Sequence, residues 1–587
     1  MTRYPVTLLL LCAFYLVACG ERQEPPPQSP EQEASQAVPE GSEAVPQVTR
    51  TEVKAGPPSG PGDYDDLVDL HAELVAWRPF SPVDGVVDYS KERIAERISE
   101  IRDMQGRLQQ IGVRGWTVPQ KVDYLTVRAE LDQEEFILRV TRPWARDPGF
   151  YLSALLEIAF TGLPVQDEEL ESLQQKLRAV PSLLEQARSN LTAVAADNAA
   201  LAIRSLTKSD GVENGYPYRE KPPPGVIGWY EDLLGRAEAD QPALEPDVNA
   251  VLTSLRGFHD RLVENEDEMD GQNGVGKEAL DWFARHALLI PYTSEEMLVL
   301  AQREFDRLWA FYALERHRNR DLPEIKLPTS REEYQERLAE TDELIRTWLV
   351  KDEVITMPEY IPKDWREMGY NVPWIERDTG PNFWEAVQYR DPSPDHLHAV
   401  IPGHRYDGWV SPRVDNAIRS KANFGARREG WAVYLEEGMM RAGLLESRPR
   451  TRELIYIFGI WRAARTVGDI KNQWNEMTAT ETADYWVDVT PMLDPDVARK
   501  YAHVRPAPGH GLQYTIGAIQ MFELLASRKR QLGDEFVLKD FHDEVMSKGK
   551  IPVALIRYEI TGNDDVVQDF WDRQSLDAFL EEHRAGD

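Results

Sequence analysis

The chain has 587 residues, 42% of them hydrophobic, and a formal net charge of −33 at pH 7. This length and hydrophobic content are enough to bury a large core without cross-links. The acidic balance excludes the usual kind of nucleic-acid-binding protein, because phosphate binding requires a basic face, and it argues against broad docking on anionic lipid.

The N-terminus has the pattern of an export signal. A short start that contains Arg3 precedes an apolar run over residues 6–18. A run of about a dozen residues is too short for a membrane span, which takes roughly 20. The run ends in a sequence that resembles the lipobox of exported bacterial lipoproteins, Leu16-Val17-Ala18-Cys19. We therefore expect a signal peptide over residues 1–18 and a lipid anchor on Cys19; an ordinary signal peptide with a chance cysteine is the alternative.

The residue after the predicted lipidation site bears on localisation. It is Gly20 rather than aspartate, so nothing resembles an inner-membrane retention signal. We expect the protein in the bacterial cell envelope, anchored to the outer membrane and facing the periplasm. Residues 19–62 are rich in Pro, Glu, Gln, Ser and Gly, a composition typical of a disordered tether.

The cysteines limit the chemistry of the remaining chain. Cys12 and Cys19 are the only two, and both belong to the export segment. The domain that follows therefore has no disulfide, no cysteine nucleophile and no thiolate ligand. Any metal in it must be held by His, Asp or Glu.

From residue 64 onward, helical periodicity dominates the sequence. The amphipathic stretches cover residues 65–77, 91–111, 119–140, 168–206, 294–318 and 330–348, and the most apolar ones cover 425–445, 453–471 and 512–532. Proline-rich residues at 217–225, 358–382 and 391–402 predict loops. We expect a mostly α fold with minor β structure, arranged as an N-terminal helical lobe (63–280) and a C-terminal helical lobe (281–587) around a cleft.

Histidines cluster in the second half of the chain. His396, His398 and His404 lie within nine residues, and a helical stretch with several carboxylates follows at 428–437. Two histidines with one carboxylate form the ligand set of a catalytic zinc site with an open fourth position. Residues of a regular α-helix turn by roughly 100° each, so His398 and His404 would point about 120° apart. The site therefore requires a break in the helix, which Pro402-Gly403 can supply.

Four motifs in order resemble one family. Residues 398–404 are similar to its HExxPGH signature, 429–436 to EGWAxYxE, 508–517 to PGQxxxYxIG, and 536–552 to FxLxxFHDxxLxxGxxP. The chain is identified by these motifs as a member of the bacterial family called domain of unknown function 885. This family is a helical relative of the zinc peptidases, with a zincin-like architecture and glutamate as third metal ligand. The resemblance covers residues 64 to about 570.

The resemblance implies roles for individual residues. His398, His404 and Glu429 take the positions of the zinc ligands. Tyr514 is placed near the site, where a phenol could donate a hydrogen bond to a developing oxyanion. His510 stands where the family usually has glutamine, and a catalytic role for it is a hypothesis.

The sequence also departs from the family pattern. Ala399 replaces the glutamate that acts as general base, and loss of such a base typically costs on the order of 10²–10⁴ in rate. Lys471 stands where relatives tend to have histidine, and Arg405 follows His404 where they usually have a histidine or a leucine-glutamine pair. Either cation would oppose a metal dication if it pointed inward.

Three interpretations follow from these motifs. The favoured one is a periplasm-facing lipoprotein with a zinc-metallopeptidase-like fold that is catalytically degenerate and binds peptide or protein in its cleft. The second is an active zinc peptidase in which Asp395, Asp407 or Glu436 substitutes as base. The third is a metal-free structural or assembly lipoprotein.

Overall fold

The structure, a computed structural model, describes residues 57–80, 82–83, 86–152, 155–208, 221–503 and 508–584. The predicted signal peptide, Cys19 and nearly all of the predicted tether lie outside the described residues. Lys54–Asp587 belong to one compact unit. In the described part of the chain, no helix combines the length and apolar character that a membrane span requires.

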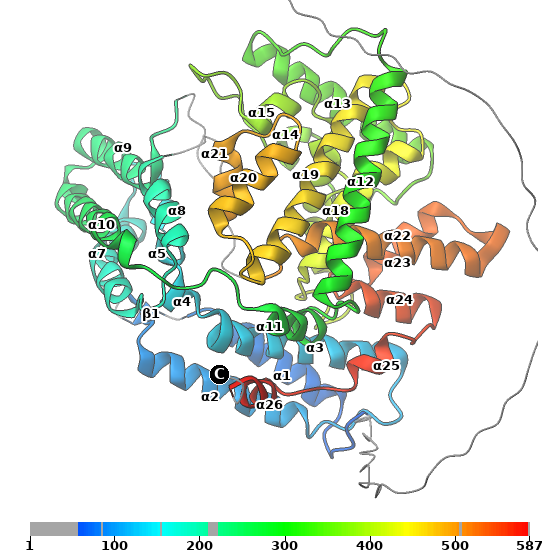
Figure 1. The fold of residues 1–587 in the computed structure, drawn as a ribbon, viewed down its shortest axis with the longest axis horizontal. Coiled ribbons are helices and arrows are strands. Elements are labelled where there is room, and N and C mark those ends of the chain that lie inside the picture. The colour runs from blue at the N-terminus through cyan, green and yellow to red at the C-terminus, as the bar shows by residue number, and fades with distance from the viewer. Residues whose placement is uncertain are drawn as a thin grey trace, which may run out of the picture. The chain divides into compact units, whose positions relative to one another are not determined.

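The fold is mostly α, as predicted (Figure 1). The first half contains α1 (Tyr64–Trp77), α2 (Lys91–Leu108), α3 (Val118–Phe136), α4 (Pro143–Arg146), α5 (Pro148–Leu152), α6 (Leu155–Ala159), α7 (Asp167–Asn190), α8 (Ala196–Thr207), α9 (Gly225–Asp240), α10 (Glu245–Asn265) and α11 (Lys277–Trp282). β1 (Pro82–Val83) and β2 (Val86–Val87) pair antiparallel, and they form the sole sheet among the described residues.

The second half contains the other α-helices. They are α12 (Ser294–Arg318), α13 (Arg331–Lys351), α14 (Trp365–Met368), α15 (Phe383–Gln388), α16 (Ser393–Asp395), α17 (His404–Val410), α18 (Gly425–Arg441), α19 (Pro449–Gln473), α20 (Ala479–Val489), α21 (Pro495–His503), α22 (Leu512–Leu532), α23 (Leu538–Ser547), α24 (Val553–Thr561), α25 (Val567–Phe570) and α26 (Leu576–Arg584). The two longest helices of the described residues are α12 and α19. Short π-helices occur at η1 (Ile137–Thr141), η4 (Phe283–Ala287) and η5 (His396–Val400). Short 3₁₀ turns occur at η2 (Pro242–Leu244), η3 (Glu266–Glu268), η6 (Ser411–Arg413) and η7 (Gly533–Glu535).

Three predictions about the elements were wrong. Residues 358–382, predicted as a loop, contain the short helix α14. The stretch predicted as one helix over 168–206 is divided into α7 and α8, because the N–H groups of Thr192 and Ala193 both donate to the carbonyl of Ala145 instead of continuing the helix. Residues 391–402, predicted as a loop, contain α16 and η5. Proline in the first turn of a helix removes an N–H that has no partner there, so Pro394 in α16 is compatible with helix.

The apolar cores show which helices pack together. One cluster lies within residues 151–262 and is formed mainly by α7, α9 and α10, with Leu177, Leu233 and Leu255 fully buried in it. The largest cluster joins α1–α3 to the second half, since Leu67 and Met521 both belong to it. The boundary between lobes at residue 280 stays a prediction.

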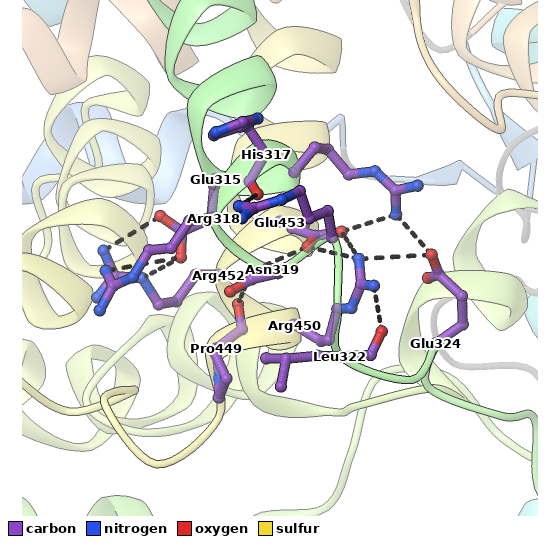
Figure 2. Close-up of polar contacts among 12 residues, drawn as sticks. Glu315, His317, Arg318, Asn319, Leu322, Glu324, Pro449, Arg450, Arg452 and Glu453 are labelled. Carbon is purple, nitrogen blue, oxygen red and sulfur yellow. Dashed lines mark hydrogen bonds and ion pairs between the residues drawn. The ribbon is translucent and has the colours of Figure 1, made fainter.

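Helices α12 and α19 pack along one another and are joined at one end by a polar network (Figure 2). Asn319, just past α12, donates to the carbonyl of Pro449 and to Glu453, both at 2.9 Å. Arg450 pairs with Glu453 at 2.9 Å, and the Arg452 guanidinium lies 2.9 Å from Glu315. These contacts connect the C-terminal end of α12 to the N-terminal end of α19.

Helices α18 and α22 approach very closely because glycines face each other at the contact. A Cβ on Gly430 would lie 2.4 Å from the backbone carbon of Gly517. Any larger residue would push the helices apart. This close approach sets the distance between the segment that carries Glu429 and the segment that carries Tyr514.

Candidate metal centre

The two histidines of the predicted site lie on either side of a break in the helix. Residues 396–400 form the π-helix η5, the chain becomes extended at Ile401, and α17 begins at His404. The turn is tight, because a Cβ on Gly403 would lie 1.9 Å from the carbonyl oxygen of His398. The break that the spacing of the histidines requires is therefore present. Single π turns are frequent at functional sites.

His398, His404 and Glu429 converge on one point. The Nε2 atoms of the two histidines are 3.1 Å apart. The Oε2 atom of Glu429 lies 3.2 Å from Nε2 of His404 and 3.6 Å from Nε2 of His398. One ligand atom from each of the three residues falls within 4.8 Å of the others. Two imidazole nitrogens and a carboxylate oxygen are the donors that zinc prefers, so the residues fit this metal.

The site is closed on one side and open on the other. The side chains of His398 and Glu429 are 10% and 7% exposed, whereas that of His404 is 27% exposed. His404 is therefore the residue of the three that is most exposed to solvent.

A buried ion pair contacts the Nδ1 side of the His398 ring. Its Nδ1 atom lies 2.8 Å from Oε1 of Glu436, and the same carboxylate pairs with Arg462 at 2.7 Å. A carboxylate at this position can accept a hydrogen bond from Nδ1–H, which leaves the Nε2 lone pair for a metal. Arg462 could not have been found from the motifs. Glu436 follows Glu429 by seven residues, about two helical turns, so the spacing did place both on one face of α18.

Burial and neighbouring charges set the protonation of the three residues. Burial opposes ionisation of Glu429, but the hydrogen bonds of His398 and His404 outweigh it and hold the pKa of Glu429 well below its usual value. Burial and Arg462 lower the pKa of His398, and the contacts with Glu429 and Glu436 overcome them, so its pKa is raised. Burial lowers the pKa of His404.

Tyr514 and His510 lie next to one another at the start of α22. The ring of Tyr514 is parallel to that of His398, with the centroids 6.4 Å apart. Burial and the charge of Glu429 raise the pKa of Tyr514, so the phenol keeps its proton and can donate a hydrogen bond. His510 contacts Tyr514, with ring centroids 5.6 Å apart, and its predicted catalytic role stays a prediction.

The comparisons with known proteins identify the family. Residues 82–560 match the model of the family described as "Bacterial protein of unknown function (DUF885)". The chain belongs to this family. None of the curated proteins matches it.

Two solved structures share the fold of this DUF885 chain. One is described as a "putative lipoprotein of unknown function" from Shewanella oneidensis, with a TM-score of 0.64 and 16% identity over 84% of this chain and 99% of that one. The other, a "putative lipoprotein" from Colwellia psychrerythraea, has a TM-score of 0.63 and 16% identity over 85% and 98%. At this level of identity the likeness concerns the fold.

The residues that depart from the DUF885 pattern do not all lie at the site. The guanidinium of Arg405 donates to the backbone carbonyls of Met368 and Tyr370, so its charge is directed there. Lys471 lies in the last turn of α19, nine residues or about 13 Å along the axis beyond Arg462. Ala399 is 6% exposed and belongs to the largest apolar core cluster. The methyl group at position 399 thus offers no carboxylate to the three converging residues.

The other polar residues singled out in the sequence have structural surroundings of their own. His396 faces away from the triad and contacts Asp342 at 2.8 Å. Asp407 is fully buried, accepts a hydrogen bond from Ser411 and pairs with Arg427. Of the three carboxylates considered as substitute bases, Asp407 and Glu436 are therefore engaged by a guanidinium.

Proposed function

We propose that this DUF885 protein is a lipid-anchored protein of the bacterial envelope whose zinc-peptidase-like centre binds peptide or protein segments without hydrolysing them. The observation that carries the proposal is the convergence of His398, His404 and Glu429 on one partly open point, beside an alanine at position 399. The predicted lipobox supports the anchor, and the two solved structures with the same fold are described as putative lipoproteins.

His398, His404 and Glu429 would hold the zinc ion. When bound, zinc supplies Lewis acidity toward a peptide carbonyl. Glu436 and Arg462 orient His398, and the protonated phenol of Tyr514 can donate to an oxygen of the ligand. Binding requires only these groups. Hydrolysis also requires a base beside the centre, and the methyl group of Ala399 cannot accept a proton.

An active peptidase is the second candidate, and Asp395 is the observation that favours it. This carboxyl is 2% exposed, and its Oδ1 accepts a hydrogen bond from Asn371 at 3.3 Å, whereas Oδ2 has no partner among the described residues. Burial raises its pKa, and the charge of His398 acts against that shift. A carboxylate with a raised pKa is suited to general-base chemistry near neutral pH.

Metal analysis and peptide cleavage test the proposal. We expect the purified domain to contain stoichiometric zinc, which His404→Ala loses, and to leave a peptide library uncleaved. Ala399→Glu should then gain cleavage. Ala399→Gln, whose side chain has the shape of glutamate but no carboxylate, should not. Cleavage by the wild type that is lost in Asp395→Asn would establish the second candidate. Absence of zinc after metal-replete purification would instead support a structural or assembly role.

A further inference from the structure

A cavity of about 660 Å³ lies between α12, α18, α19 and α22. Glu436 and Arg462 line it, and these are the two residues that contact Nδ1 of His398. The three candidate metal ligands do not line it. The cavity and the metal centre therefore share the Glu436–Arg462 pair as a common wall. Ligand pockets of proteins typically measure 300–1,000 Å³, so the volume suits a substantial ligand group.

The interior of the cavity is apolar. Leu308 and Phe311 line it from α12, Ile455 from α19, and Ala518, Ile519 and Phe522 from α22. Water in such a space finds few hydrogen-bond partners and is readily displaced by an apolar group. The lining therefore favours a large hydrocarbon or aromatic side chain as occupant.

The charged residues around the cavity favour a cation beside that apolar group. Arg307 is bound by Glu304 and Glu437, each at 2.5 Å, so these two carboxylates share one guanidinium. Glu437 also contacts Arg441 at 3.1 Å. Glu523 accepts a hydrogen bond from Tyr292 at 2.7 Å and has no basic partner in the described part of the chain. The lining holds four carboxylates and three guanidinium groups, which leaves an excess of negative charge in a chain that is already strongly acidic.

We propose that this cavity binds a large apolar side chain of the peptide ligand, next to a basic residue of the same peptide. The inference rests on the proposed function, because the metal centre next to the cavity would bind the polar part of that peptide. Arg462 and Glu436 line the cavity and also contact His398, so the cavity directly adjoins the residues that contact this histidine. The preferred ligands are thus apolar–basic peptides rather than apolar–acidic ones.

Cavity binding can be tested separately from metal binding. A neutral phenylnaphthylamine fluorophore is titrated into metal-free protein, into Ala518→Phe, which fills the cavity, and into the control Ala313→Phe, which changes an exposed position on α12. We expect the affinity for the fluorophore to fall at least 10-fold in Ala518→Phe and to stay unchanged in Ala313→Phe. If Ala518→Phe does not fold, Ile519→Trp replaces it. Equal binding by the filled variant and the wild type overturns the assignment of the cavity.

Competition with peptides tests the class of occupant. Zinc-loaded wild-type protein with bound fluorophore receives short peptides that contain Phe-Arg or Phe-Glu. We expect the Phe-Arg peptides to displace the fluorophore at concentrations at least 10-fold lower. Equal displacement by both overturns the charge preference, and no displacement by either overturns peptide binding in the cavity. The metal-free titration does not depend on zinc, so its result would stand even if the proposed metal centre were wrong. Failure of the cavity assignment and failure of the metal centre can therefore be told apart.

Discussion

At the scale of single residues, Glu436 is the carboxylate that contacts Nδ1 of His398. Its carboxylate lies 2.8 Å from Nδ1 of His398 and is itself held by Arg462. Partners of this kind fix the tautomer and orientation of a metal-binding imidazole, and their loss typically weakens metal binding 10–100-fold. We therefore propose that Glu436 positions His398 rather than binding the metal or acting as a base.

The first prediction concerns this residue. Glu436→Gln should weaken zinc binding by about 10–100-fold, because an amide neither pairs with Arg462 as an anion nor fixes the Nδ1 proton as firmly. Competition with a chromogenic chelator measures the affinity. Glu437→Gln is the matched control, since the neighbouring carboxylate pairs with Arg307 and Arg441 instead of the site. Equal zinc affinities for the wild type and Glu436→Gln would contradict the positioning role.

At the scale of elements, the contact between α18 and α22 depends on the absence of side chains. Gly430 and Gly517 meet there, and an added Cβ on Gly430 would overlap the backbone of Gly517. We expect Gly430→Ala to lower the free energy of unfolding by about 1–3 kcal/mol, because the helix backbones must move to relieve the overlap. Chemical denaturation at neutral pH measures this change.

The control for that substitution is a glycine in open space. Gly106 lies near the end of α2, is exposed, and has nothing within 4 Å of an added Cβ. Gly106→Ala should therefore stabilise the protein by about 0.5–1 kcal/mol, since alanine loses less backbone entropy in a helix. If Gly430→Ala destabilises the protein no more than a substitution at the surface does, the two helices can separate freely and the prediction is wrong.

Sequence periodicity predicted the long helices well and the site segment poorly. Residues 512–532 were predicted as a helix and form α22, because their apolar face repeats with the helical period. Residues 391–402 were predicted as a loop from their prolines, yet they contain α16 and η5. Propensity misses this segment because Pro394 occupies a first turn and because the π turn depends on tertiary packing rather than on local preference.

At the scale of the whole molecule, burial of neutral histidine makes stability depend on pH. His542, in the motif near the C-terminus, is fully buried. Its Nδ1 contacts the carbonyl of Val354 and its Nε2 contacts the hydroxyl of Tyr434, each at 2.8 Å. Burial lowers the pKa of His542 to about 4, whereas an unfolded histidine titrates near 6.5. The motif histidine thus ties α18 and α23 to the loop after α13 and has no contact with the metal ligands among the described residues.

This depressed pKa has a definite sign for stability. As pH falls below about 6.5, the unfolded chain takes up a proton at this position before the folded chain does, so unfolding becomes more favourable. The contribution is fully present above pH 6.5 and is lost as the pH falls to about 4, by roughly 3 kcal/mol in total.

Urea denaturation between pH 7 and pH 4.5 measures this dependence. We expect the free energy of unfolding to fall with pH less steeply in His542→Asn than in the wild type, although the variant is less stable at neutral pH. His317→Asn, at an exposed position on α12, should keep the wild-type slope. Parallel slopes for the wild type and His542→Asn would exclude His542 as a source of acid sensitivity.

The sequence alone determined the family, the mostly helical fold and the types of residue available to a metal. Motifs, periodicity and the lack of cysteine after residue 19 can all be read directly from the order of residues along the chain. Only the tertiary structure decided that His398, His404 and Glu429 meet, that Arg405 is directed elsewhere, and that Arg462 joins the centre to an apolar cavity. His398, His404 and Glu429 lie on successive segments within residues 398–429, whereas Arg462 comes from the separate helix α19. Their distances depend on how α18, α19 and α22 pack, and no local pattern encodes that packing.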